Sequence, residues 1–360
     1  MKRARRYLAL GFITLLMAVS FNNCAQPKFS EAVKDVSSSG DPRTPGDDEG
    51  GTIVNKSKTV NIQDISKLDV LVVIDNSGSM KYEQKNMGDR FSRFMEQIAE
   101  LQWRVGIITT DMSSTSQELK DGRLVTIKDR TERWLDSAGP LAAQAQGYFS
   151  DTVQRTEEGS GYEQGIGATY RSIERAFTSG DANNGFFRDD AALAVVVVTD
   201  ADETGDRNDP KNLKDRNRGE NLVKLVASKW PGKPFIFNGI IVKSGDEACK
   251  NTDRTINQNE GYGVAYEKAA ALTGGITGSV CEADYGTQLS SIGSGVSKVV
   301  RSIGLECAPV DADGDGKVDI TVYNQASAQY LTNFTVSGSL LTFSDVLPSG
   351  VTTLNYNCRE

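Results

Sequence analysis

Histidine is absent from this chain of 360 residues. Because imidazole activates many catalytic nucleophiles and ligates zinc and copper, its absence excludes His-dependent acid–base catalysis and His-ligated metal sites. The sequence also contains no Walker motif, no nucleophile elbow and no internal repeat. Its formal net charge of −8 argues against a broad nucleic-acid-binding face. What is present is a hydrophobic fraction of 38%, which is enough for a sizeable core in one large and one small domain.

A long membrane-spanning run is lacking as well, because the apolar stretch at residues 7–20 is too short for a comfortable span. It follows a basic segment, and this order predicts an export signal over residues 1–23. Cys24 follows directly, so the segment resembles a bacterial lipoprotein signal, which implies that Cys24 carries a lipid anchor. Residues 21–23 depart from the small-residue pattern of such signals, which leaves an ordinary secretion signal as the alternative.

Cysteine is scarce, and the number of cysteines, five, is odd for an exported protein. Lipidation of Cys24 leaves the other four for two disulfides in an oxidising compartment. We expect the pairs Cys249 with Cys281 and Cys307 with Cys358, because each pair then joins one local region. A zinc site is the competing interpretation, but the close C-x-x-C spacing typical of such sites is missing.

The chain divides into segments of different composition. Residues 24–57 are polar and turn-forming, which predicts a flexible tether. Residues 58–304 alternate strand and helix patterns, which predicts an α/β fold with a doubly wound, mostly parallel sheet. Residues 305–360 show short strands and turns, which predicts a small C-terminal β-rich module clipped by Cys307 and Cys358.

Apolar spacing also predicts the individual elements. In the α/β segment we expect strands at 70–74, 105–110, 192–198, 235–242 and 275–280, and helices at 81–101, 166–176, 221–230, 263–272 and 288–303. In the module we expect short strands at 319–323, 334–336, 340–343 and 352–356.

The apolar run Val70–Ile74 ends abruptly in a D-x-S-x-S sequence formed by Asp75, Ser77 and Ser79. Its length and β-branched residues suit a central parallel strand, and ligands gather just beyond the carboxyl ends of such strands. One carboxylate and two hydroxyls from a single turn are suitable oxygen ligands for a hard cation such as Mg²⁺. The motif is short, so a polar turn that binds nothing is the alternative.

A second apolar run, residues 192–198, ends in Thr199 and Asp200. Two buried strands then bring carboxylates to the same edge of one sheet. Over the middle of the chain, these two strands and their polar ends resemble the von Willebrand factor A domain family. The resemblance implies a metal-ion-dependent adhesion site, whose ligands in this sequence are Asp75, Ser77, Ser79 and Asp200.

The resemblance also implies a threonine ligand from a loop between these strands, and none occurs at the matching place, residues 158–165. Ser160 supplies the missing hydroxyl in one interpretation, and Glu163 supplies a carboxylate in the other. Glu163 equally suits the first turn of a helix, where the helix dipole favours an acid. Asp111, which ends the strand at 105–110, is either an outer acceptor or an ordinary turn residue.

Two further polar segments carry charge. Residues 201–219 form a long loop at the proposed metal edge; its acids and bases are most simply a solvated surface, although specificity often resides in such loops. In the module, an Asp-rich loop resembles the start of calcium loops through Asp311, Asp313, Asp315 and Asp319. Its twelfth position is Val322 and not the glutamate of an EF-hand, so it is either a weaker, extracellular-type Ca²⁺ loop or a turn that binds nothing.

The resemblance to a lipoprotein signal implies a lipid-anchored protein of the cell envelope. The resemblance to the von Willebrand factor A family implies that it binds another macromolecule through a Mg²⁺-type site, with Mn²⁺ or Ca²⁺ as alternative ions. Neutral serine ligands leave the ion electrophilic, so an acidic group of the partner completes its coordination. The expected partners are a protein or other envelope or extracellular macromolecule that carries an acidic group, and the membrane through the anchor; nucleic acid is not expected. We expect no enzyme; the alternatives are a metal-assisted hydrolase using Asp75 or Asp200, and a scaffold with a purely structural metal.

Overall fold

The computed structural model describes residues 51–62, 67–113, 119–156, 159, 161–205, 208–209, 211–254, 261–345 and 350–359. The expected export signal, the expected lipidation site Cys24 and most of the expected tether lie outside these residues. No helix within the described ranges is long and apolar enough to cross a membrane.

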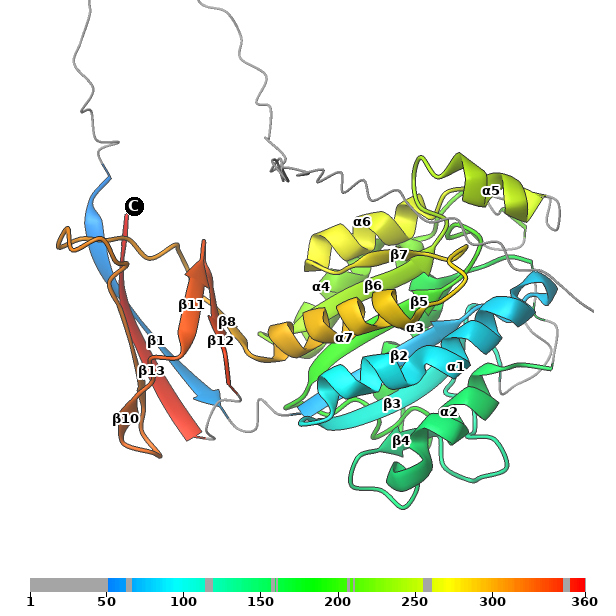
Figure 1. The fold of residues 1–360 in the computed structure, drawn as a ribbon, viewed down its shortest axis with the longest axis horizontal. Coiled ribbons are helices and arrows are strands. Elements are labelled where there is room, and N and C mark those ends of the chain that lie inside the picture. Colours follow the sequence, from blue (N-terminus) through cyan, green and yellow to red (C-terminus); the bar gives the residue numbers. More distant parts are fainter. Residues whose placement is uncertain are drawn as a thin grey trace, which may run out of the picture. The chain divides into compact units, whose positions relative to one another are not determined.

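A six-stranded, mostly parallel sheet forms the centre of the α/β part (Figure 1). Its strands, in the order β4-β3-β2-β5-β6-β7, are β4 (Trp134–Asp136), β3 (Gln102–Thr109), β2 (Lys67–Ile74), β5 (Ala192–Val198), β6 (Phe235–Ile241) and β7 (Thr277–Ser279). The apolar side chains of β2 and β5 are buried, as their uninterrupted β-branched runs predict. These two strands pair in parallel up to Ile74 opposite Val198, so their carboxyl ends are level.

Helices cover both faces of this sheet. Those described are α1 (Lys81–Ile98), α2 (Ala145–Val153), α3 (Gly165–Ala176), α4 (Gly219–Lys229), α5 (Glu247–Arg254), α6 (Val264–Thr273) and α7 (Gly286–Val300). The apolar side chains of α1, α2 and α7 pack on one face, and those of α3, α4 and α6 pack on the other. Figure 1 shows α1 and α7 side by side on the same face of the sheet. The predicted doubly wound α/β fold is confirmed.

The structure differs from the sequence-based elements in a few places. The helix expected to run to residue 303 ends at Val300, and Ser302–Gly304 form β8 instead, because these residues pair with a strand of the β-rich module. Helices α2 and α5 were not expected. In α2 the buried positions Ala145, Phe149 and Val153 follow helical spacing, but glycine, serine and threonine between them weaken the pattern.

The β-rich module consists of two antiparallel sheets, with strand orders β1-β13-β9-β10 and β11-β12-β8. The strands not yet given are β1 (Ile53–Ile62), β9 (Ile320–Asn324), β10 (Gln329–Tyr330), β11 (Phe334–Ser337), β12 (Leu340–Phe343) and β13 (Gly350–Arg359). Both sheets contribute to one apolar core, which includes Ile303, Val322, Leu341 and Leu354. The predicted β-rich module is therefore present.

The expected boundaries at residues 57 and 58 need correction. Residues 53–57, assigned to the tether, and residues 58–62, assigned to the α/β domain, together form β1, which pairs with β13 over its whole length. The partner strand lies at the other end of the chain, so nothing local in the polar sequence of β1 reveals the pairing. The α/β part is thus inserted in sequence between β1 and the other strands of the module.

Two disulfides join the cysteines in the expected pairs. Cys249 of α5 is linked to Cys281, which follows β7. Cys307 is linked to Cys358 of β13, inside the module. The first disulfide therefore joins two segments of the α/β part, and the second joins two segments of the module.

Candidate metal centre

Asp75 lies directly after β2 at the carboxyl edge of the sheet and is fully buried. Its backbone is fixed on both sides, because its N–H donates to the carbonyl of Val198 (3.0 Å) and its carbonyl accepts from Nε2 of Gln84 (2.8 Å). Its carboxylate accepts from the Ser77 N–H at Oδ1 (2.8 Å) and from Oγ1 of Thr199 at Oδ2 (2.7 Å). The side chain is thus held in one position by the strand, by the turn that follows it and by the end of β5.

Ser77 and Ser79 lie on the turn between β2 and α1, where Gly78–Met80 forms a short 3-10 helix. Their Oγ atoms are 3.1 Å apart and both side chains are half-buried. Two hydroxyl oxygens therefore lie next to the Asp75 carboxylate on one turn, as the D-x-S-x-S spacing predicts.

Asp200 follows β5 and is buried beside Asp75. Burial, followed by the charge of Asp200, raises the pKa of Asp75 to about 7. The level ends of β2 and β5 therefore bring the two carboxylates together at the sheet edge, as expected.

Glu163 comes from the loop before α3 and is buried at the same edge. Its Oε2 accepts from Oγ1 of Thr110 (2.6 Å), and its carbonyl accepts from the N–H and Oγ1 of Thr204 (2.8 and 2.9 Å). Burial raises the pKa of Glu163 well above its usual range, and the charges of Asp75 and Asp200 raise it further. Ser160, the alternative third-loop ligand, lies outside the described residues.

The third loop also contacts the first motif through its backbone. The Gly159 N–H donates to the carbonyl of Asn76 (2.8 Å). A Cβ added at residue 159 would lie 2.4 Å from Oδ1 of Asn76, so a larger residue here would require the Asn76 side chain to move. The absence of a side chain at residue 159 therefore lets the third loop approach Asn76 closely.

Three polar side chains that hold Asp75 and Glu163 in place were not predicted from the sequence: Thr110, Thr199 and Gln84. Thr110 comes directly after β3 and Thr199 directly after β5. A polar residue at the end of a central strand was the feature of the sequence that could have indicated their role. Gln84 on the first turn of α1 carries no such signal, because only the folded chain brings it to Asp75. Asp111 takes the turn role: its carboxylate accepts from the Ser113 N–H within its own turn (2.8 Å), and its backbone forms a bridge to Glu163. A role as outer acceptor of the metal site stays a prediction.

The polar loop at residues 201–219 is more than a solvated surface. Glu203 and Asn217 are buried, and Oε1 of Glu203 accepts from Nδ2 of Asn217 (2.6 Å). Asp202 accepts from the N–H of Ala265, at the start of α6 (3.0 Å). This loop therefore contributes to the interior of the domain, which corrects the expectation from composition.

The residues at the sheet edge fit a divalent cation in their chemistry. They offer carboxylates from Asp75, Asp200 and Glu163 and hydroxyls from Ser77 and Ser79, all of which are oxygen donors. Like charges that raise one another's pKa are stabilised by a nearby cation. The three carboxylates do not all come within 4.8 Å of one another, unlike a group in the Asp-rich loop. Their roles as ligands stay a prediction.

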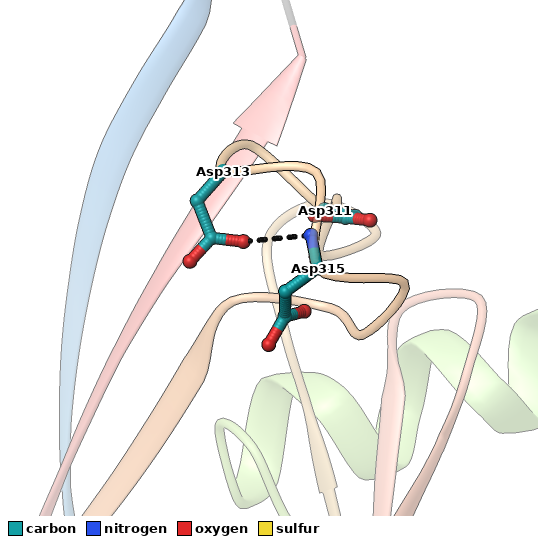
Figure 2. A group of neighbouring side chains, drawn as sticks. All are labelled: Asp311, Asp313 and Asp315. Carbon is teal, nitrogen blue, oxygen red and sulfur yellow. Dashed lines mark hydrogen bonds between the residues drawn. The ribbon is translucent and has the colours of Figure 1, made fainter.

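The Asp-rich loop brings three exposed carboxylates together, those of Asp311, Asp313 and Asp315 (Figure 2). Figure 2 shows the carboxylate of Asp313 accepting from the Asp315 N–H (3.1 Å). Asp319 is not in this group, and its Oδ2 accepts from the Ala312 N–H instead (2.8 Å). The calcium role of this loop stays a prediction, because hydrogen bonds within the loop also account for its shape.

No family model matches the chain, and no curated protein matches it. Among solved structures, proximal thread matrix protein 1 from the mussel byssus aligns with 68% of this chain and 51% of its own, at 16% identity and a TM-score of 0.38. The structure of the same protein with a zinc occupied MIDAS motif aligns with 68% of this chain and 50% of its own, at 17% identity and a TM-score of 0.37. The pilus adhesin SpaC from Lactobacillus rhamnosus GG, in its open conformation, aligns with 85% of this chain and 41% of its own, at 11% identity and a TM-score of 0.35.

The chain thus spans about half the length of the mussel protein and less than half that of the adhesin. At these identities and scores, none of the three defines the family of this chain.

Proposed function

We propose that this protein is a metal-dependent binding module of von Willebrand factor A type, which captures an acidic group of another macromolecule. The observation that supports it best is the position of Asp75 and Asp200 at the level ends of β2 and β5, where burial and then the charge of Asp200 raise the pKa of Asp75. Two buried acids at one edge are costly unless a proton or a cation neutralises them. A bound divalent cation supplies that neutralising charge and a coordination position for a ligand.

In this proposal the residues of the chain have distinct roles. Asp75 and Asp200 supply charge, Ser77 and Ser79 supply neutral oxygens, and Glu163 takes the place of the third-loop ligand. The neutral hydroxyls leave room for a carboxylate of the partner to complete the coordination. We propose binding and not catalysis, because the chain contains no histidine and the acids at this edge are assigned to the ion.

We also propose that the module acts outside the cytoplasm at the cell envelope, with Cys24 as its lipid anchor. The two disulfides are typical of an oxidising compartment and support export. The anchor rests on the sequence around Cys24 alone.

The proposal is tested first by direct metal binding. Isothermal titration with Mn²⁺ should show binding to the wild-type chain and no measurable binding to Asp75→Asn, because that substitution removes a charged ligand at the centre of the cluster. Asp89→Asn is the matched control, since Asp89 lies exposed on α1 and pairs with Lys85. Equal Mn²⁺ affinity in wild type and Asp75→Asn would contradict the site.

The second test is partner capture from envelope extract by the immobilised chain. Bound protein should be recovered with Mg²⁺, lost on chelation, and lost in Asp75→Asn but not in Asp89→Asn. Capture that survives both chelation and Asp75→Asn would overturn metal-dependent binding even if Mn²⁺ itself binds.

A further inference from the structure

Glu203 is a buried acid that has no place among the expected metal ligands. It lies three residues after Asp200, and its carboxylate points at the start of α3. Oε2 accepts from the Ile166 N–H (2.8 Å), and Oε1 accepts from the Gly167 N–H (2.9 Å). Both oxygens of Glu203 are therefore used to bind the first turn of this helix, whose N–H groups have no partners within the helix itself.

A second side chain completes this arrangement. The hydroxyl of Tyr266, on α6, accepts from the Gly165 N–H (3.1 Å) and lies close enough to the Glu203 carboxylate for each group to shift the pKa of the other. The residue before the helix, Gln164, makes no side-chain capping bond to α3. The first three N–H groups of α3 are therefore bound by residues from distant parts of the chain and not by a local cap.

The start of α3 also fits this contact sterically. A Cβ added at Gly167 would lie 2.5 Å from Nδ2 of Asn217, the amide that donates to both Glu203 and Gln164. Glycine at residue 167 thus allows the loop after β5 to approach the helix.

This contact fixes the third loop of the metal centre. Glu163 is only two residues before the first residue of α3, so the position of the helix start limits where its carboxylate lies. The next residue after Glu203, Thr204, donates from both N–H and Oγ1 to the carbonyl of Glu163. The loop after β5 therefore touches Glu163 directly and also fixes the helix that follows it.

We infer that Glu203 is the positioning residue of the metal centre: it fixes the start of α3 so that Glu163 lies beside Asp75 and Asp200. The inference deepens the proposed function and rests on it, because it assumes that Glu163 serves the ion. In this arrangement the loop after β5 contributes Asp200 as a ligand. Three residues later, the same loop contributes Glu203, which positions the third-loop ligand Glu163.

The test is the Mn²⁺ affinity of the full chain carrying Glu203→Gln. In glutamine an NH₂ group replaces one of the two carboxylate oxygens and faces an N–H group, so the contact in which each oxygen accepts from its own N–H is lost and the helix start should shift. The affinity for Mn²⁺ should fall roughly 10- to 100-fold, which is typical for loss of a group that orients a metal ligand. The melting temperature is measured in parallel, because a purely structural role would lower it without changing the affinity of the folded protein.

The matched control is Asp202→Asn. It removes one negative charge from the same loop, but asparagine keeps the oxygen that accepts from the Ala265 N–H, and α3 is not touched. Its Mn²⁺ affinity should stay close to that of wild type. An equal loss in Asp202→Asn and Glu203→Gln would show that charge and not position is responsible, and would overturn the inference.

If Glu203→Gln does not fold, Tyr266→Phe gives the answer, because it removes only the hydroxyl that accepts from the Gly165 N–H beside Glu203 at the start of α3. It should weaken Mn²⁺ binding in the same direction, and an unchanged affinity overturns the inference. Failure of the proposed function looks different: partner capture that ignores chelation overturns that function, while the Mn²⁺ affinities still decide the role of Glu203.

Discussion

A buried acid lies near each end of β2, Asp69 at the amino end and Asp75 just after the carboxyl end, and the two have different neighbours. At the amino end, Asp69 is buried against the guanidinium of Arg188, 2.8 Å away, which is an ordinary structural ion pair. At the carboxyl end, Asp75 is bound by an N–H and a hydroxyl and has another acid, Asp200, beside it. Burial raises the pKa of both acids, so the difference lies in the neighbours: Asp69 has a cation beside it, whereas Asp75 has a second acid, which is an arrangement that a bound cation would stabilise.

The residue scale yields a pH prediction for the metal-free protein. Burial raises the pKa of Glu203 from 4.5 to about 7, and burial with Asp200 raises that of Asp75 to about 7. A group whose pKa is higher in the folded state stabilises the fold below its unfolded pKa, and this contribution is lost as the pH rises through the folded value. The free energy of unfolding should therefore fall between about pH 4.5 and 7, by on the order of 3 kcal/mol for Glu203 alone.

Urea unfolding in the presence of a chelator, at a series of pH values across this window, measures the effect. Glu203→Gln should show a shallower decline than wild type, because it lacks one of the titrating groups. Acids with lowered pKa values, such as Asp121 and Asp190, lose their contribution only at lower pH and do not mask the effect. A wild-type stability that stays level or rises over the window would contradict the raised pKa values.

At the scale of elements, β1 is the least expected part of the fold. Its ten residues pair antiparallel with β13 in full register, from Ile53 opposite Arg359 to Ile62 opposite Gly350. It is also an edge strand, so β13 would become the edge if β1 were absent. The strand that follows the amino-terminal segment is therefore a structural part of the C-terminal module.

Removal of β1 should destabilise the module and leave the α/β part intact. All three tryptophans, Trp103, Trp134 and Trp230, lie in the α/β part, whereas Tyr323 and Tyr356 lie in the module. A chain starting at residue 63 should keep the tryptophan fluorescence transition of wild type and lose only the part of the tyrosine near-ultraviolet signal that comes from the module, since the other tyrosines of the folded chain lie in the α/β part. A chain starting at residue 51 is the control, and equal behaviour of the two chains would show that the pairing is not needed.

At the scale of the whole molecule, the α/β part is inserted in sequence between β1 and the other strands of the β-rich module. Each part has its own core, and each contains its own disulfide. A disulfide within each part restricts the unfolded chain of that part, which stabilises it in an oxidising compartment.

The proposed anchor makes a whole-molecule prediction. Cys24→Ser should move the protein from the membrane fraction to the soluble fraction of the cell envelope, because the lipid-bearing cysteine is lost. Fractionation followed by immunoblotting measures this, with Cys249→Ser as a control that removes a cysteine without touching the anchor. Unchanged membrane association of Cys24→Ser would favour an ordinary secretion signal.

The sequence by itself determined the strands that carry the metal motif. Val70–Ile74 and residues 192–198 are continuous apolar runs rich in β-branched residues, which are typical of central parallel strands buried on both faces. Because parallel strands end at the same edge, the meeting of Asp75 and Asp200 followed from the pattern. The disulfide pairs followed in the same way, since each joins one local region.

Only the tertiary structure decided which polar residues lie inside and which segments pair at long range. Glu203 sits in a stretch that is charged throughout, and its burial depends on contacts with α3 and α6 that no local pattern encodes. The pairing of β1 with β13 likewise joins the two ends of the described chain. Periodicity reports which face of an element is apolar, whereas the partner of a polar group is set by where distant elements come together in space.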